Sequence, residues 1–321
     1  MTRMPPGPPD EEAPKNLTDF SEGLTAREYL AHRYEASELP SLPLADEGFV
    51  REWEIWLASK RAAVPDVDDI FSDEAVASWL QETPAGRIPV LYASSRTSFE
   101  RAMNVLYPGV FSTGIQASVN AFTVQTRHPA LCGHRVILLN KAGYSSLSGK
   151  EVGMSEEEWH EKSLTIRLNH EVCHYFSLRV LGGMQNHVLD EIAADCVGQL
   201  AAFGTYNASL QRRFFGISES GGDILPGNRF SFYVKKLLIN DSIREVLEET
   251  NAALSGLESY LSKNPYMLLE SNRPHLTIKI LSAGIRGIHD LTSISFVSYP
   301  FWCKDGARKR ERNKKGIGEI S

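Results

Sequence analysis

Apolar residues follow a helical spacing in the middle of the chain. They recur every four positions from Leu164 through Leu168, Val172 and Phe176 to Val180. Because residues four apart lie on the same face of an α-helix, this stripe predicts a helix that buries one side along its length.

Residues typical of the start and of the end of a helix stand on the two sides of this stripe. Ser155 followed by Glu158 has the form of a capping box, in which the two side chains satisfy backbone N–H groups of the first turn. Gly182 and Gly183 follow the last apolar position, where a left-handed residue ends a helix at little cost. The sequence therefore predicts one long helix between these two points.

A second helix is predicted at residues 188–204. Gly204 marks its end, and its residues are mostly apolar. The expected buried positions are Leu189, Ile192, Ala193, Cys196 and Leu200. Since the segment between the two helices is short and contains the two glycines, we expect the second helix to pack antiparallel to the first.

Strands are predicted upstream of the long helix. Residues 88–92, 119–126 and 136–140 are rich in β-branched and aromatic residues, and residues 98–107 are expected to form a helix that packs on them. The segment 135–140 is either an edge strand that pairs with an extended peptide or an inner strand, and the inner position is the commoner one.

The regions on either side of this central part are predicted to be mainly helical. Residues 24–82 form a helical lead-in interrupted by the turn-rich stretch 65–69, and residues 206–300 form several helices, one of them broken near Asn240. The buried points expected in the lead-in are Trp53, Trp56, Leu57, Val76 and Leu80. The predicted fold class is therefore α+β, mainly helical, with a small mixed sheet.

This pattern divides the chain into five segments. We expect a flexible N-terminal arm, a helical N-terminal region, a core that carries the chemistry, a helical C-terminal region and a basic disordered tail. Their expected bounds are 1–20, 21–85, 86–205, 206–305 and 306–321. The tail contains Arg308, Lys309, Arg310, Arg312, Lys314 and Lys315. A solubilising end is favoured over contact with nucleic acid or an acidic membrane surface.

Composition narrows the class of protein. The 321 residues are 42% hydrophobic and 23% charged with a net charge of −6, which is typical of a globular protein and argues against a dedicated nucleic-acid binder. No apolar run is long enough to cross a membrane, and the start lacks the apolar region of a signal peptide, so the expected location is the cytoplasm. Four cysteines without a C-x-x-C pair fit reduced thiols.

The long helix carries an H-E-x-x-H array. His170 and His174 are four residues apart and lie on one helix face, so both imidazoles can bind the same ion. Glu171 is turned by roughly 100° from His170, from where its carboxylate reaches a water on the metal without binding the metal itself. This arrangement predicts a zinc site with Glu171 as the general base.

A third ligand is expected from the second helix. A catalytic zinc site needs three protein ligands and an open position. Glu191 has the reach to bind the ion, and Asp195, one turn later, can accept the free N–H of a ligand histidine and fix its orientation. Asp190 is the alternative third ligand.

These residues resemble the thermolysin-like gluzincin zinc metallopeptidases. The likeness consists of His170-Glu171-x-x-His174 followed by Glu191-x-x-x-Asp195 and covers about residues 155–204. It implies a zincin-like core in which the two histidines and Glu191 bind one zinc ion, Glu171 is the base and Asp195 orients a histidine.

This sequence departs from related patterns at two points. The spacer between the histidines and Glu191 is somewhat shorter than in thermolysin. Ser177 and Val180 stand where an H-x-x-G-x-x-H continuation needs glycine and histidine, which excludes a metzincin.

Further side chains are candidates near such a site. A donor that stabilises the oxyanion is expected from outside the two helices, and the candidates are His275, Arg229, Tyr233 and Tyr260, each with a structural role as the alternative. His187 is either a cleft residue or an ordinary loop histidine. Cys173 is a possible zinc ligand, although a small buried residue is favoured, and Cys196 is expected in the core.

The resulting hypothesis is a cytoplasmic zinc metallopeptidase that acts on a peptide or protein. The alternative is a catalytically silent zinc-binding regulatory or interaction protein, against which the intact Glu171 argues. A third possibility is a nucleic-acid-associated protein that works through the basic tail. The sequence indicates no membrane span and no particular oligomeric state.

Overall fold

The structure is a computed structural model that describes most of the chain. The described residues are 24–34, 47–109, 119–131, 133–183, 187–225, 229–234, 237 and 240–291. The expected N-terminal arm (1–20), the basic tail (306–321), Cys132 and Cys303 lie outside these residues.

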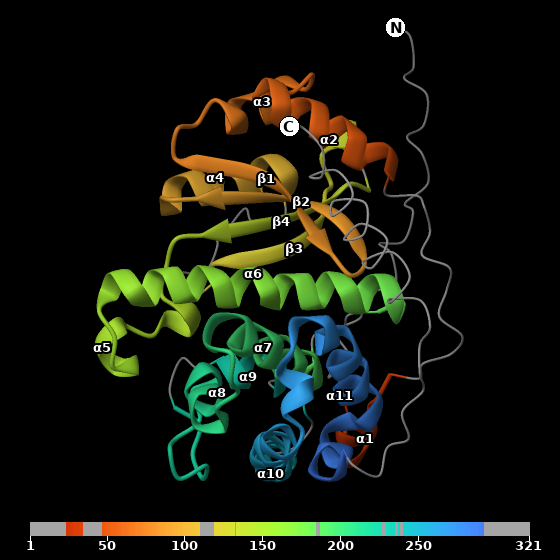
Figure 1. Ribbon diagram of the computed structural model, residues 1–321, viewed down its shortest axis with the longest axis vertical. Helices are drawn as coiled ribbons and strands as arrows, with labels where there is room; N and C mark the ends of the chain where they lie inside the picture. The colour runs from red at the N-terminus through yellow and green to blue at the C-terminus, as the bar shows by residue number, and fades with distance from the viewer. Residues whose placement is uncertain are drawn as a thin grey trace, which may run out of the picture.

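The molecule has two layers that meet at the long helix α6 (Figure 1). The first layer holds α2–α4 and the sheet, and the second holds α7–α11 together with α1. The strands are β1 (Val76–Thr83), β2 (Gly86–Ala93), β3 (Ala121–Gln125) and β4 (Arg135–Asn140). The α-helices are α1 (Ala26–Ala31), α2 (Glu47–Ser59), α3 (Pro65–Phe71), α4 (Arg96–Leu106), α5 (Gly149–Val152), α6 (Glu156–Val180), α7 (Val188–Phe203), α8 (Ala208–Phe215), α9 (Arg229–Val234), α10 (Asn240–Lys263) and α11 (Arg273–Gly287). The 3-10 helices are η3 (Pro129–Leu131), η4 (Tyr144–Ser146), η5 (Pro265–Leu268), η6 (Glu270–Asn272) and η7 (Ile288–Asp290).

The sheet is small and mixed, as predicted. Its strand order is β1-β2-β4-β3, with β2 and β4 parallel and the other two pairs antiparallel. The segment 135–140 is therefore an inner strand, and its interpretation as an edge strand is wrong. The edge position beside it belongs to β3, which pairs with β4 in the register Thr123↔Ile137.

The lead-in region differs from its prediction at two points. Val76 and Leu80 lie in strand β1, which forms a hairpin with β2, and not in a helix. Their strand conformation depends on cross-strand partners such as Val90 opposite Trp79, which a local apolar pattern does not reveal. The stretch 65–69 is the start of α3, where Pro65 occupies the first turn and acidic residues favour the helix N-terminus.

Helix α6 forms as its pattern predicts. The hydroxyl of Ser155 accepts the N–H of Glu158 at 3.2 Å, and Gly182 beyond the other end has a positive φ of 73°. The predicted stripe packs against the sheet in one hydrophobic cluster, in which Phe176 and Val180 join Ile137 and Leu139. The opposite side of α6 is left to face α7.

Helices α6 and α7 pack antiparallel at close range. His174 lies beside Glu191 and His170 beside Asp195, and further along Lys162 Nζ donates to the carbonyl of Ala202 at 2.8 Å. Between these points a Cβ on Gly198 would lie 2.9 Å from the Ile166 carbonyl oxygen. The glycine therefore permits the close crossing that brings polar side chains of the two helices together.

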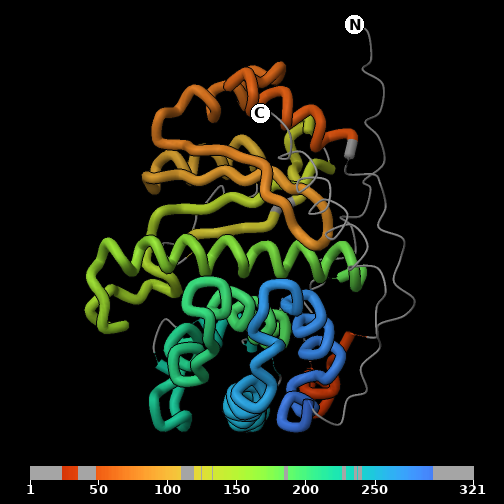
Figure 2. Tube along the Cα trace, viewed as in Figure 1, coloured from red at the N-terminus to blue at the C-terminus, as the bar shows by residue number. Residues whose placement is uncertain are grey.

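The second layer surrounds α7 with helices from both ends of the chain. Its core joins Leu189, Ile192 and Leu200 to residues of α10 and α11. The N-terminal helix α1 lies beside α10 and α11, far from its sequence neighbours α2 and α3 (Figure 2). The N–H of Tyr34 donates to the carbonyl of Leu281 at 3.0 Å, which fixes this segment on α11.

The predicted break near Asn240 is confirmed, since α10 begins there as a helix separate from α9. Among the described residues, no helix is long and apolar enough to cross a membrane.

Candidate metal centre

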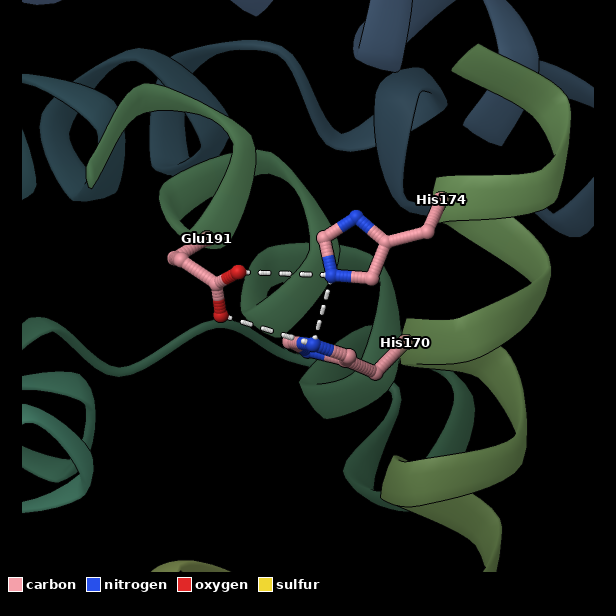
Figure 3. A group of neighbouring side chains, drawn as sticks. All are labelled: His170, His174 and Glu191. Atoms are coloured by element: carbon pink, nitrogen blue, oxygen red, sulfur yellow. Dashed lines mark hydrogen bonds and ion pairs between the residues drawn. The ribbon is translucent and has the colours of Figure 1, made fainter. Parts of the chain in front are cut away.

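Two histidines and one glutamate converge between α6 and α7. His170 and His174 project from α6 toward Glu191 on α7 (Figure 3). Their exposed fractions are 6%, 6% and 5%, so all three side chains are buried. In the described part of the chain, these three residues form the group whose donor atoms lie close enough to share a metal ion.

The spacing of the donor atoms fits one ion. A tetrahedral ion with bonds of about 2.0–2.1 Å holds its ligand atoms about 3.3 Å apart. The two Nε2 atoms are 2.9 Å apart, His170 Nε2 lies 3.5 Å from Glu191 Oε2, and His174 Nε2 lies 3.4 Å from Glu191 Oε1. Two imidazole nitrogens and a carboxylate oxygen form a ligand set of the kind found in catalytic metal sites with an open position.

Asp195 orients the first histidine. Its Oδ1 lies 2.9 Å from His170 Nδ1, so the ring nitrogen that faces away from Glu191 donates to a carboxylate. This contact fixes the ring with its Nε2 toward the other two ligand atoms. The supporting role of Asp195 stays a prediction, and this contact is the one that it requires.

Tyr144 joins this contact from η4, after strand β4. Its hydroxyl donates to Asp195 Oδ1 at 2.5 Å and lies 2.8 Å from His170 Nδ1. Burial raises the pKa of Tyr144 well above its usual value, so the phenol remains protonated and can donate. Sequence reasoning missed this residue, because a single tyrosine in a loop has no pattern of its own.

Arg229 on α9 reaches the acidic side of the site. It contacts the Glu191 carboxylate, lies 3.0 Å from Asp195 Oδ1, and donates to the Tyr144 hydroxyl at 3.3 Å. Its Nε donates to the hydroxyl of Tyr233 at 3.2 Å. Among the further candidates suggested by the sequence, Arg229 and Tyr233 are thus brought to the site.

The charges around the ligands keep the carboxylates ionised. Burial alone raises the pKa of Glu191, but Arg229 and the two histidines hold it well below its usual value. Asp195 behaves in the same way, with Arg229 and His170 lowering its pKa against the effect of burial. Burial acts to lower the pKa of His174. The hydrogen bond to Glu191 and its charge act in the opposite direction, and the resulting pKa is raised to about 9.

Glu171 lies on α6 outside the ligand group. It is 6% exposed, and its Oε2 accepts a hydrogen bond from the Thr123 hydroxyl of β3 at 2.8 Å. The carboxylate is therefore placed between the helix and the edge strand, beside the histidines but not among the three residues that converge.

The remaining candidates from the sequence lie outside the converging group. His187 is fully buried at the N-terminus of α7, where Nδ1 accepts the N–H of Leu189 at 3.0 Å and Nε2 lies 3.1 Å from the Tyr29 carbonyl oxygen. His275 lies on α11 and Tyr260 on α10, and neither belongs to the converging group of His170, His174 and Glu191.

The side chains considered as alternative ligands make their contacts outside the converging group. Asp190 accepts a hydrogen bond from the Tyr34 hydroxyl at 2.6 Å and is not part of the converging group. Cys173 is buried and lies 3.6 Å from the Thr277 hydroxyl, and burial raises its pKa to about 12. Cys196 lies in the core of the second layer, as expected.

Fold and site together define a mainly helical α+β protein with a buried His-His-Glu group that fits one metal ion. The chain belongs to a family of unknown function (DUF7005), whose model matches residues 115–283. This match spans β3, both site helices and α9, and therefore includes every site residue described above. Comparisons with curated proteins and with solved structures give no match.

Proposed function

We propose that the protein is a zinc-dependent metallopeptidase of the gluzincin type. The observation that supports this proposal best is the separation of roles within the motif. His170, His174 and Glu191 point to one another with the spacing of ligands, whereas Glu171 is held apart by Thr123. A carboxylate beside a three-ligand site is the arrangement that hydrolysis by an activated water requires.

A small number of side chains would carry out the proposed hydrolysis. A zinc ion would be held by His170, His174 and Glu191 and would supply Lewis acidity toward a water and a carbonyl group. The Glu171 carboxylate accepts the proton of the attacking water and returns it to the nitrogen of the leaving amine. Asp195 and Tyr144 keep the His170 ring oriented throughout.

Among the described strands, β3 is an edge strand of the sheet, and its outer edge offers a place for an extended substrate. Asn140 N–H donates to Asn120 O and Thr126 N–H to His134 O, each at 2.8 Å, so even-numbered residues of β3 bond to β4. Since bonded and non-bonded pairs alternate in an antiparallel ladder, the backbone groups of Ala121 and Thr123 face away from β4. A peptide that pairs with them lies beside Glu171.

The proposal is tested by metal analysis combined with peptide cleavage. We expect purified protein to hold one zinc per chain and to cleave members of a mixed peptide library. Glu171→Gln should keep the zinc and lose at least about 100-fold in kcat, because the amide accepts no proton. His174→Ala should lose both. Activity that persists in Glu171→Gln contradicts the proposal.

One observation favours a second function, a catalytically silent zinc-binding regulatory protein. Arg229 pairs with both Glu191 and Asp195, so the acidic side of the site is already neutralised and closed by protein groups. Stoichiometric zinc without cleavage of any library peptide supports this alternative over the peptidase.

A further inference from the structure

Thr123 brings strand β3 into contact with the motif glutamate. Its side chain points to the α6 side of the sheet, since its neighbour Phe122 packs on the opposite side against Phe99. The Thr123 hydroxyl lies 2.8 Å from Glu171 Oε2 and 3.0 Å from the Glu171 carbonyl oxygen. Both acceptors belong to the same residue of α6.

The carboxylate is the stronger of these two acceptors. A threonine hydroxyl carries one hydrogen and donates fully to one partner at a time. The Glu171 carbonyl lies inside α6, where a backbone N–H four residues later already satisfies it. A hydrogen bond from a hydroxyl to a charged acceptor is shorter and about twice as strong as one between neutral groups. The hydroxyl therefore serves mainly the Glu171 side chain.

We infer that Thr123 is a positioning residue for Glu171, an inference that depends on the proposed peptidase function. The hydroxyl holds Oε2 on the β3 side of the helix and leaves Oε1 to exchange the proton. Among the described residues, the Thr123 hydroxyl is the hydrogen-bond partner of the Glu171 carboxylate, so without it the carboxylate can turn toward the two histidines of the same helix. Thr123 thus keeps the base from becoming an additional ligand.

The same residue also faces the proposed substrate position. The backbone N–H and C=O of Thr123 point to the side of β3 away from β4, while its hydroxyl points to the base. Thr123 therefore contacts both the proposed substrate, through its backbone, and the base, through its hydroxyl. A small displacement of the Glu171 carboxylate changes the distance over which the proton moves. Such a displacement lowers kcat more than it changes KM.

The kinetic test compares two substitutions at this position. Thr123→Val keeps the β-branched shape that suits a strand but removes the hydroxyl, and Thr123→Ser keeps the hydroxyl. We expect kcat about 10-fold lower in Thr123→Val with KM within about twofold, and kcat near that of the wild type in Thr123→Ser. Thr126→Val is the matched control, because Thr126 also lies on this segment but its hydroxyl donates to the Leu131 carbonyl.

A second measurement does not depend on activity. In a double-mutant cycle on the metal-free protein, Thr123→Val should lower the urea midpoint of unfolding. It should lower it much less in a Glu171→Ala background, because the bonded carboxylate is already absent. If the hydroxyl instead serves only the helix carbonyl, the two backgrounds lose the same amount.

The outcomes separate this inference from the proposed function. Equal losses in both backgrounds, or an unchanged kcat in Thr123→Val, overturn the role of Thr123 while leaving a cleaving wild type as a peptidase. A wild type that holds zinc but cleaves nothing overturns the peptidase proposal and the kinetic role of Thr123 with it, even when the cycle shows the contact. Coupling in the cycle together with the selective fall in kcat supports both.

Discussion

The candidate metal centre is an arrangement of residues that the sequence predicts only in part. The spacing of His170, Glu171 and His174 along one helix indicates their roles, because helix geometry fixes which of them share a face. Glu191 follows from the same rule on the next helix. Tyr144 and Arg229 enter from segments distant in sequence, and their contacts with Asp195 depend on tertiary packing that no local pattern encodes.

Tyr144→Phe tests this network at the residue scale. The substitution removes the hydroxyl that donates to Asp195 and lies beside His170, so the imidazole is held less firmly. We expect zinc affinity to fall about 10-fold, as is typical when a group that orients a ligand is lost. A competition titration with a chromophoric chelator measures the change.

Tyr206→Phe is the matched control for this substitution. Tyr206 is buried, and its hydroxyl has no hydrogen-bond partner among the described residues. Its loss should leave zinc affinity unchanged. Equal affinities in Tyr144→Phe and the wild type would show that Asp195 alone orients His170.

The elements were predictable where their patterns are local. Helices α6 and α7 carry strong periodicity and clear ends, and both form as expected. Strand β1 did not follow from its sequence, because eight residues of mixed polarity become a strand only when β2 pairs with them. The identity of the edge strand depends on the order β1-β2-β4-β3, which no single segment reveals.

The close crossing of α6 and α7 depends on Gly198. A Cβ at this position would lie 2.9 Å from both the carbonyl oxygen and the Cγ2 atom of Ile166, so Gly198→Ala forces the helices apart. We expect a loss of about 1–3 kcal/mol in the free energy of unfolding, as for other overpacked cores. Zinc affinity should fall as well, since the ligands come from both helices.

Gly48→Ala provides the comparison in urea unfolding. Gly48 also lies in a helix, and a Cβ there meets nothing within 4 Å. Alanine should be neutral or should stabilise the protein by up to about 1 kcal/mol. If Gly198→Ala behaves in the same way, close packing at Gly198 does not limit the crossing.

At the scale of the whole molecule, α6 divides a sheet layer from a helical layer (Figure 1). Residues 24–34 lie in the helical layer near the start of α7, where the Tyr34 hydroxyl donates to Asp190 beside Glu191. His32 is buried there with its ring 4.7 Å from that of His187. This docking joins residues about 150 positions apart, which explains why the sequence did not predict it.

The buried histidine makes this docking sensitive to acid. Burial lowers the pKa of His32 to about 4, whereas the unfolded chain has a value near 6.5. Between these values the unfolded state binds a proton that the folded state excludes. The unprotonated His32 therefore leaves the free energy of unfolding unchanged above about pH 6.5. The free energy of unfolding falls as the pH is lowered toward 4, and the loss at pH 5 is at most about 2 kcal/mol.

Urea unfolding at pH 7.5 and pH 5 measures this loss. His32→Leu should show a smaller difference between the two pH values than the wild type, although other groups contribute to both. The same difference in both proteins would mean that the His32 ring takes up protons in the folded state as readily as in the unfolded chain.

The central claim is that His170, His174 and Glu191 hold one zinc ion while Glu171 and Cys173 do not bind it. X-ray absorption at the zinc edge of the purified protein tests this most directly, because it reports the ligand atoms and their distances. We predict one zinc per chain with two imidazoles and one carboxylate at about 2.0–2.2 Å. A sulfur ligand at about 2.3 Å, or protein without stoichiometric metal, would contradict the account.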